Sequence, residues 1–176
     1  NKSLNNLKSL NFFKNVKSEI IDGKDQNSKI INITVEEKAT GQISAGAGLG
    51  TSGSSISFGV KENNYLGKGI NVNSNLTISD ETVKGLFSVR NSNYNNTDKS
   101  VYTSIEALET DRLTNFGYKT NRVGFSLGTD FEYFEDFYLG IGGSSFFEDI
   151  ETNKTASDRQ KAQTGNYWDT FLKLDF

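Results

Sequence analysis

The chain has 176 residues, enough for one domain or little more, and it contains no Cys, His, Pro or Met. Without Cys and His it cannot form a Cys/His zinc site, a haem ligated through His or Cys, a Ser-His-Asp or Cys-His catalytic centre, or a disulfide scaffold. Its net charge is only -3, so it has no basic field that would favour nucleic acid. We therefore expect no enzymatic activity, no cofactor, no metal and no nucleic-acid partner.

The hydropathy of the chain distinguishes between two kinds of membrane segment. A mean hydropathy of -0.54 and the lack of an 18-residue apolar run exclude a transmembrane helix. They leave open a membrane β-barrel, because barrel strands alternate apolar and polar residues, and the 17 Gly, 13 Phe and 7 Tyr favour such a sheet. The chain begins Asn1-Lys2-Ser3 without an initiator, so we interpret it as a piece of a longer, processed protein.

The first 38 residues differ in pattern from the rest of the chain. Leu4, Leu7 and Leu10 recur at helical spacing and predict a short amphipathic helix. Two apolar-rich runs follow, separated by a segment with the composition of a turn. The predicted elements are a helix over residues 3–10, a strand over 12–21, a turn over 22–27 and a strand over 29–36.

From Gln42 onward the apolar residues recur with a period of two. In the clearest run Ile70 and Val72 fall on one face, and Asn71 and Asn73 on the other. The runs are about 8 to 12 residues long, close to the roughly 9 to 11 residues that a tilted strand needs to cross a bilayer. Eight strands are predicted, in residues 42–50, 55–61, 70–78, 82–91, 101–107, 122–131, 134–147 and 168–176.

The two faces and the ends of these strands suit a membrane barrel. Asn, Ser, Gly and charged residues on the second face are typical of a wet lumen, which predicts that Ile56, Phe58, Val60, Ile70, Val72, Leu76 and Ile78 face lipid. Short and long connections should lie at opposite ends, with 131–137 tight and 148–167 long, although 91–100 is longer than this rule predicts. Aromatic residues near strand ends are interpreted as interfacial girdles: Tyr65, Tyr94, Phe116, Tyr118, Tyr133, Phe134, Tyr167 and Trp168.

Two motifs with possible chemistry have simpler interpretations. Residues 48–53 match the G-x-G-x-x-G dinucleotide fingerprint, but a period-two run follows where the phosphate-binding helix should begin. This segment is therefore predicted to be a Gly/Ser turn between antiparallel strands. The acidic groups in 106–111, 132–136 and 148–151 lack the pattern of an EF-hand, and we interpret them as solvated strand ends.

The first of the eight strands has few side chains that could fix its register. Gly46, Gly48 and Gly50 alternate along one face, with only Ala45 and Ala47 opposite them. Strands of this composition are weakly specified. The pattern fits equally a small-residue patch packed on a neighbouring element and a strand that changes its pairing partner.

Four stretches together resemble the Omp85 superfamily of outer-membrane proteins. Residues 10–16 and 31–37 are similar to the end of a POTRA module, 41–50 to the first barrel strand, and 61–69 to the turn between the second and third strands. The chain departs from the family in lacking the first strand and helix of a POTRA module. It has Asn91-Ser92-Asn93 where Asn-Pro is common, and no Arg-Gly-Phe or Arg-Gly-Tyr motif.

The resemblance implies a mainly β protein in which a partial α/β POTRA module, residues 1–38, precedes the first eight antiparallel strands of a larger barrel, residues 39–176. It implies assembly of outer-membrane β-barrels by strand templating at a lateral gate, in the outer membrane of a Gram-negative bacterium with the N-terminal segment in the periplasm. The implied partners are unfolded outer-membrane proteins, assembly-complex lipoproteins, a periplasmic chaperone and membrane lipid. The implied site residues are the gate strand Gln42, Ile43, Ser44, Ala45, Gly46, Ala47, Gly48, Leu49 and Gly50, and the periplasmic turn Asn64, Tyr65, Leu66, Gly67 and Gly69.

Two other interpretations remain open at the level of the sequence. Leu172, Leu174 and Phe176 alternate as in the closing strand of a barrel, which favours a complete eight-stranded outer-membrane barrel with a structural or binding role. A soluble β-sandwich that binds a ligand or a partner is the third possibility.

Overall fold

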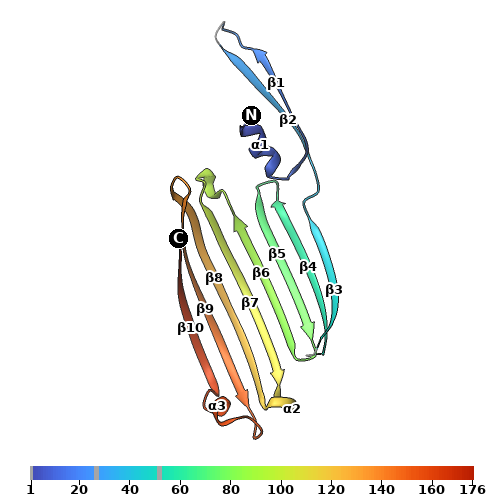
Figure 1. The fold of residues 1–176 in the computed structure, drawn as a ribbon, viewed down its shortest axis with the longest axis vertical. Helices are drawn as coiled ribbons and strands as arrows, with labels where there is room; N and C mark the ends of the chain where they lie inside the picture. The colour runs from blue at the N-terminus through green and yellow to red at the C-terminus, as the bar shows by residue number, and fades with distance from the viewer. Residues whose placement is uncertain (1, 26–27, 51–52) are drawn as a thin grey trace. The chain divides into compact units, whose positions relative to one another are not determined.

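The structure, a computed structural model, describes residues 2–25, 28–50 and 53–176. The chain divides into two compact units, Asn1–Thr40 and Gly41–Phe176 (Figure 1). In the described part of the chain, no helix is long and apolar enough to cross a membrane.

The first unit is a helix followed by a two-stranded sheet. Helix α1 spans Lys2–Ser9, β1 Phe13–Asp22 and β2 Lys29–Glu37, close to the predicted bounds. The strands are antiparallel, with Val16 opposite Val35 and Ile20 opposite Ile31. Helix α1 packs on β1 with Leu4 and Leu7 half-buried, whereas Leu10 is 48% exposed. The predicted helix and sheet are thus present, but Leu10 contributes little to their packing.

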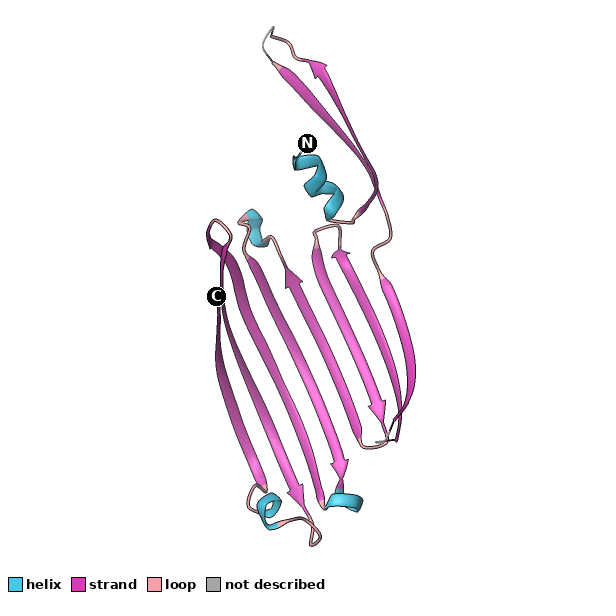
Figure 2. Cartoon of the chain, in the orientation of Figure 1, coloured by secondary structure: helices cyan, strands magenta, loops and turns pink. Residues whose placement is uncertain are grey.

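The second unit is an antiparallel sheet, whose strands are drawn in magenta in Figure 2. Its eight strands lie in the order β10-β9-β8-β7-β6-β5-β4-β3. Every strand pairs with its neighbour in sequence, as expected for a meander. Strands β4 and β5 are joined through residues 66–69, which confirms the predicted hairpin. The strands are β3 Gln42–Gly50, β4 Gly53–Tyr65, β5 Ile70–Ser79, β6 Thr82–Asn91, β7 Ser100–Arg112, β8 Tyr118–Phe134, β9 Phe137–Thr152 and β10 Gly165–Asp175.

The strand boundaries near the C-terminal end of the sheet differ from the prediction. Strand β8 continues to Phe134 and β9 begins at Phe137, so the seventh run begins three residues later than predicted. The turn between them needs no glycine, because Asp136 takes a positive φ of 61° and its N–H donates to the Glu132 carboxylate at 2.9 Å. Strand β9 also continues to Thr152, which shortens the predicted long connection to residues 153–164.

Short helical turns lie in three of the connections. These are the 3-10 turn η1, Tyr94–Asn96, and the helices α2, Leu113–Phe116, and α3, Asp158–Lys161. Helix α3 begins with a capping box, in which the Ser157 hydroxyl accepts from the Gln160 N–H and the Gln160 side chain accepts from the Ser157 N–H. Helix α2 ends at Gly117, whose φ of 77° suits glycine.

Along β7 the pattern of burial is the reverse of that in a water-soluble protein. Residues that share the face of Ile105 are exposed, and residues on the opposite face are half-buried. Ile105 is 55% exposed, and its cross-strand neighbours Phe87 and Phe125 are 45% and 48% exposed. Among the described residues only Ala156 is a buried hydrophobic, at 5% exposure. The sheet therefore presents a continuous apolar face, called here the outer face, and a polar inner face.

Candidate functional site

Strand β3 forms one edge of the eight-stranded sheet, and β10 forms the other. Within the described residues β3 pairs only with β4, and all nine of its residues are exposed. Ile43 and Leu49 are 87% and 91% exposed. The glycine- and alanine-rich segment, residues 42–50, is therefore an edge strand. Its other edge is open to a further strand.

Side-chain packing between β3 and β4 is sparse on both faces. On the inner face, a methyl group at Gly46 would lie 2.9 Å from the Ser57 hydroxyl, and one at Gly48 would lie 3.2 Å from the Ser55 hydroxyl. A methyl group at Gly50 would meet nothing within 4 Å. The outer face of β3 carries only Ala45 and Ala47 between its two ends. The pairing therefore depends mainly on the backbone ladder.

The direction in which the β3 amides point follows from one hydrogen bond on β4. The Ser54 N–H donates to the Asp80 carboxylate at 3.0 Å, so it points toward β5 and away from β3. Ser54 lies opposite Leu49, and the register from there to Gln42 is free of bulges. Because N–H and C=O directions alternate along an antiparallel strand, the Leu49 pair is one without hydrogen bonds. The N–H and C=O of Leu49 therefore point to the free edge of β3.

The same alternation assigns the rest of the strand. Ile43, Ala45, Ala47 and Leu49 present their N–H and C=O groups to the open edge, and their side chains lie on the outer face. Gln42, Ser44, Gly46, Gly48 and Gly50 direct their backbone groups to β4. The free edge of β3 thus offers the backbone donors and acceptors of four residues, from Ile43 to Leu49, to another strand.

The second predicted site is the turn between β4 and β5. The Gly67 N–H donates to the Asn64 carbonyl at 2.9 Å, and the Gly69 N–H donates to the Asn64 side-chain oxygen at 2.7 Å. Leu66, Gly67 and Gly69 have φ of 57°, 70° and 65°, which explains the two glycines. Tyr65 ends β4 and is 48% exposed. The turn is therefore closed by hydrogen bonds within itself.

The inner face carries a polar network that the sequence pattern did not reveal. Arg90 on β6 donates to Asp130 on β8 at 2.6 Å, and its guanidinium lies 4.7 Å from the ring centroid of Tyr102 on β7. Tyr102 lies across two glycines, because a methyl group at Gly142 would be 2.6 Å from its hydroxyl and one at Gly128 would overlap the ring. The contacting pairs of this network are 12 to 40 positions apart in sequence, so only the register brings them together.

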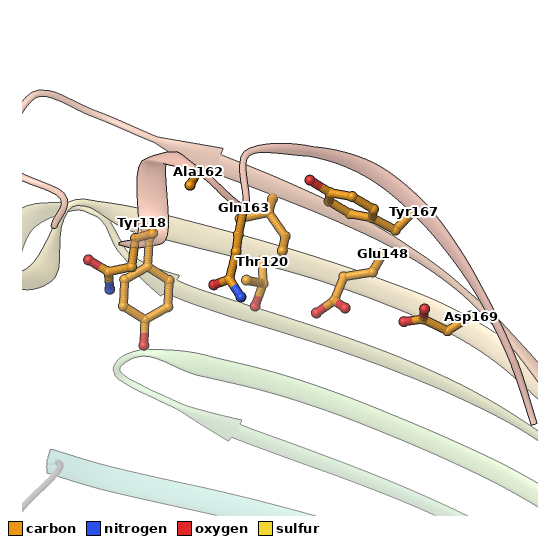
Figure 3. Close-up of a pocket in the computed structure, with 9 residues that line it drawn as sticks. Tyr118, Thr120, Glu148, Ala162, Gln163, Tyr167 and Asp169 are labelled. Carbon is orange, nitrogen blue, oxygen red and sulfur yellow. The ribbon is translucent and has the colours of Figure 1, made fainter. Parts of the chain in front are cut away.

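A cavity of 560 Å³ lies between the inner face of β8–β10 and the α3 segment (Figure 3). Its lining includes Tyr118 and Tyr167 together with the carboxylates of Glu148 and Asp169. The assignment of these two tyrosines to an interfacial girdle was therefore wrong, because both point to the inner side of the sheet. Among the described residues no three acidic side chains are placed to hold a metal ion.

Comparison with known proteins gives one informative result. No family model matches the sequence. Among solved structures, the crystal structure of BamA from Haemophilus ducreyi lacking POTRA domains 1–3 matches with a TM-score of 0.75 at 21% sequence identity. The match covers 99% of this chain and 36% of that one, so the chain spans about a third of the length of the protein it matches. The chain has the fold of the BamA barrel region, with an antiparallel sheet of eight strands.

Proposed function

We propose that the chain is a fragment of an Omp85-type assembly factor, a protein that inserts and folds outer-membrane β-barrels without covalent chemistry. In this proposal β3 is the gate strand that templates an incoming strand. The observation that carries the proposal is the free edge of β3, where Ile43, Ala45, Ala47 and Leu49 direct their N–H and C=O groups away from β4. The BamA-like fold supports it.

The physical basis of templating is the cost of unpaired backbone groups in lipid. Each unsatisfied N–H or C=O in hydrocarbon costs several kcal/mol, so a nascent sheet cannot insert with an open edge. A strand that already has unpaired groups at membrane depth lets the incoming chain form its ladder as it enters. Because the bonding residues of β3 have outer-face side chains, the residues of the guest strand that bond them also have side chains facing lipid.

The two units have different proposed locations. Residues 1–38 are proposed to be the C-terminal part of a POTRA-like domain in the periplasm, and 39–176 the first eight strands of a barrel in the outer membrane of a Gram-negative bacterium. The apolar, exposed outer face of the sheet supports the membrane location. The proposed partners are unfolded outer-membrane proteins, lipoproteins of the assembly complex, a periplasmic chaperone and lipid. The proposed periplasmic turn is Asn64–Gly69.

Removing one edge-facing donor tests this proposal in the full-length protein reconstituted in lipid vesicles. Ala45→Pro deletes an N–H that points to the free edge and keeps the ladder to β4, so the sheet should remain while barrel assembly falls about tenfold or more. Ala45→Ser keeps the donor and should assemble normally. Replacing Ala45 with the corresponding α-hydroxy acid removes the donor without a ring and should reproduce the proline result.

A folded Ala45→Pro protein that assembles barrels at the normal rate would overturn templating by this edge. Gly46→Pro is the matched comparison, because its N–H bonds to β4. That substitution should weaken the β3–β4 pairing itself, which would appear as loss of the hairpin rather than loss of assembly alone.

The alternative function is that of an eight-stranded barrel with a structural or binding role, in which the opposite edge of the sheet would pair with β3. By the same alternation Trp168, Thr170, Leu172 and Leu174 on β10 direct their backbone groups to their own free edge. Leu172 and Leu174 are 90% and 71% exposed. Strands β3 and β10 are antiparallel and could pair. Disulfide formation between Cys introduced at Ser44 and at Lys173 in the full-length protein would support this closure, and its absence would favour the larger barrel.

A further inference from the structure

The turns at one end of the eight-stranded sheet are joined by side-chain hydrogen bonds. This end, called here the distal end, holds the end of β3, the start of β4 and the β5–β6 connection together with α2 and α3 (Figure 1). Ser54, the second residue of β4, donates from its N–H to Asp80 Oδ2 at 3.0 Å and from its hydroxyl to Asp80 Oδ1 at 2.9 Å. Asp80 belongs to the β5–β6 turn, so its carboxylate ties the two neighbouring hairpins together.

Further bonds extend this tie across the sheet. Next to Asp80, the Glu81 carboxylate accepts from Arg112 Nε at 2.7 Å and from Asn115 Nδ2 at 3.4 Å. The Asn153 side chain then donates to the Leu113 carbonyl at 2.9 Å. The bonds thus link the β3–β4 hairpin to the β5–β6 turn, to α2 and to the β9–β10 connection. We call this set the distal clasp, formed by Ser54, Asp80, Glu81, Arg112, Asn115 and Asn153.

The start of β4 is shaped to receive the Asp80 carboxylate. Gly53 has a φ of 99°, and a Cβ at that position would overlap the Asp80 side chain. The Ser54 N–H, and then the Ser54 hydroxyl, hold the pKa of Asp80 below its usual range, so the carboxylate is charged when it bonds the hairpin. Charge-assisted bonds of this kind are stronger than neutral ones.

We propose that Asp80 is a positioning residue, which holds the distal end of the β3–β4 hairpin so that the free edge of β3 is presented in a fixed place. This inference rests on the proposed templating function. The glycines and alanines of β3 give its position little support from side chains, and the two bonds from Ser54 act at the adjoining end of β4. Without them the edge would still carry its donors, but their position relative to the rest of the sheet would vary.

Distances between spin labels test the proposal in the full-length protein in lipid vesicles. One pair, at Leu49→Cys and Val83→Cys, reports on β3 relative to β6, and a second, at Ile105→Cys and Phe147→Cys, reports on the sheet away from the clasp. Asp80→Ala should at least double the width of the first distance distribution, leave the second unchanged, and lower the rate of barrel assembly about tenfold, since two bonds to a charged acceptor are lost. Asp80→Asn keeps an acceptor oxygen and should recover most of both properties. Asp98→Ala, at the opposite end, is the control and should change neither.

Two results would overturn the positioning role. One is an unchanged first distance distribution in Asp80→Ala, and the other is a broadened distribution with normal assembly. Failure of the unsubstituted protein to assemble any barrel would instead overturn the proposed function, and the label distances would still decide whether Asp80 holds β3.

Discussion

On the inner face, aromatic side chains lie over glycines of neighbouring strands. Tyr102 covers Gly142 and Gly128, and Phe146 lies over Gly124 in the same way. Arg90 stacks on Tyr102 and pairs with Asp130, while Arg122 stacks on Phe146 at 4.0 Å. A Cβ at Gly124 or Gly128 would overlap the aromatic ring that lies over it, whereas a Cβ at Gly142 would meet the Tyr102 hydroxyl.

A double-mutant cycle tests this packing at Gly142. Its methyl group would lie 2.6 Å from the Tyr102 hydroxyl but 3.7 Å from the ring carbon that carries it. Gly142→Ala should lower the free energy of unfolding by about 1 kcal/mol, and much less in a Tyr102→Phe background, where the hydroxyl is absent. The free energy of unfolding is measured by denaturant in detergent for the unsubstituted protein, the two single variants and the double variant. Equal costs in the two backgrounds would show that the tyrosine does not fill the space above Gly142.

The contribution of Asp80 to the stability of the folded protein depends on pH and can be measured. Its pKa is lowered by the bonds from Ser54, so the stabilisation is present above the usual aspartate pKa and is lost as the pH falls through the lower pKa of the folded state. The difference in thermal midpoint between the unsubstituted protein and Asp80→Asn should therefore be largest above about pH 4 and shrink below it. The charged residues Glu81, Asp111 and Arg112 line a pocket together with Asp80, and they are retained in both proteins. A difference that grows on acidification would contradict the assigned bonds.

At the scale of the strand, period-two patterning was a sufficient guide to the sheet. The apolar and polar alternation predicted eight strands and the faces of their residues, because one residue of shift would exchange the two faces. The β8–β9 turn was misplaced since Phe134-Glu135-Asp136-Phe137 contains no glycine, and its left-handed residue is an aspartate held by Glu132. The sequence could not show which residues of β3 direct their backbone groups to the free edge. That assignment requires the Ser54–Asp80 hydrogen bond, which joins residues 26 positions apart and has no local sequence pattern.

The assignment of faces predicts opposite responses at adjacent positions of β7. Ile105, near the middle of the strand, is exposed on the outer face, whereas Ser104 lies on the inner face opposite Ser88 and Ser126. Ile105→Arg should cost about 2 to 4 kcal/mol of stability in lipid, since its charge would lie at membrane depth, and Ser104→Arg should cost much less. Reversible folding into vesicles provides the measurement. Similar costs at the two positions would contradict the membrane-facing assignment.

At the scale of the whole molecule, the described residues leave the outer edges of β3 and β10 unpaired. The one buried hydrophobic residue among them is Ala156, in the β9–β10 connection, and large apolar side chains are exposed along the outer face. A surface of this kind suits lipid. Unpaired backbone groups at a strand edge are costly in lipid, so such an edge favours pairing with another strand. Templating by β3 therefore requires that the edge of this strand be free when assembly occurs.

A reversible crosslink tests that requirement most directly. In the full-length protein, a Cys introduced at Ser44 and another on the final strand of the barrel would fix the edge of β3 in place when oxidised. We expect barrel assembly in lipid vesicles to stop in the oxidised protein and to return on reduction, while either single Cys protein assembles normally under both conditions. Assembly at the full rate with the disulfide formed would contradict templating by β3, because the edge would then have no need to open.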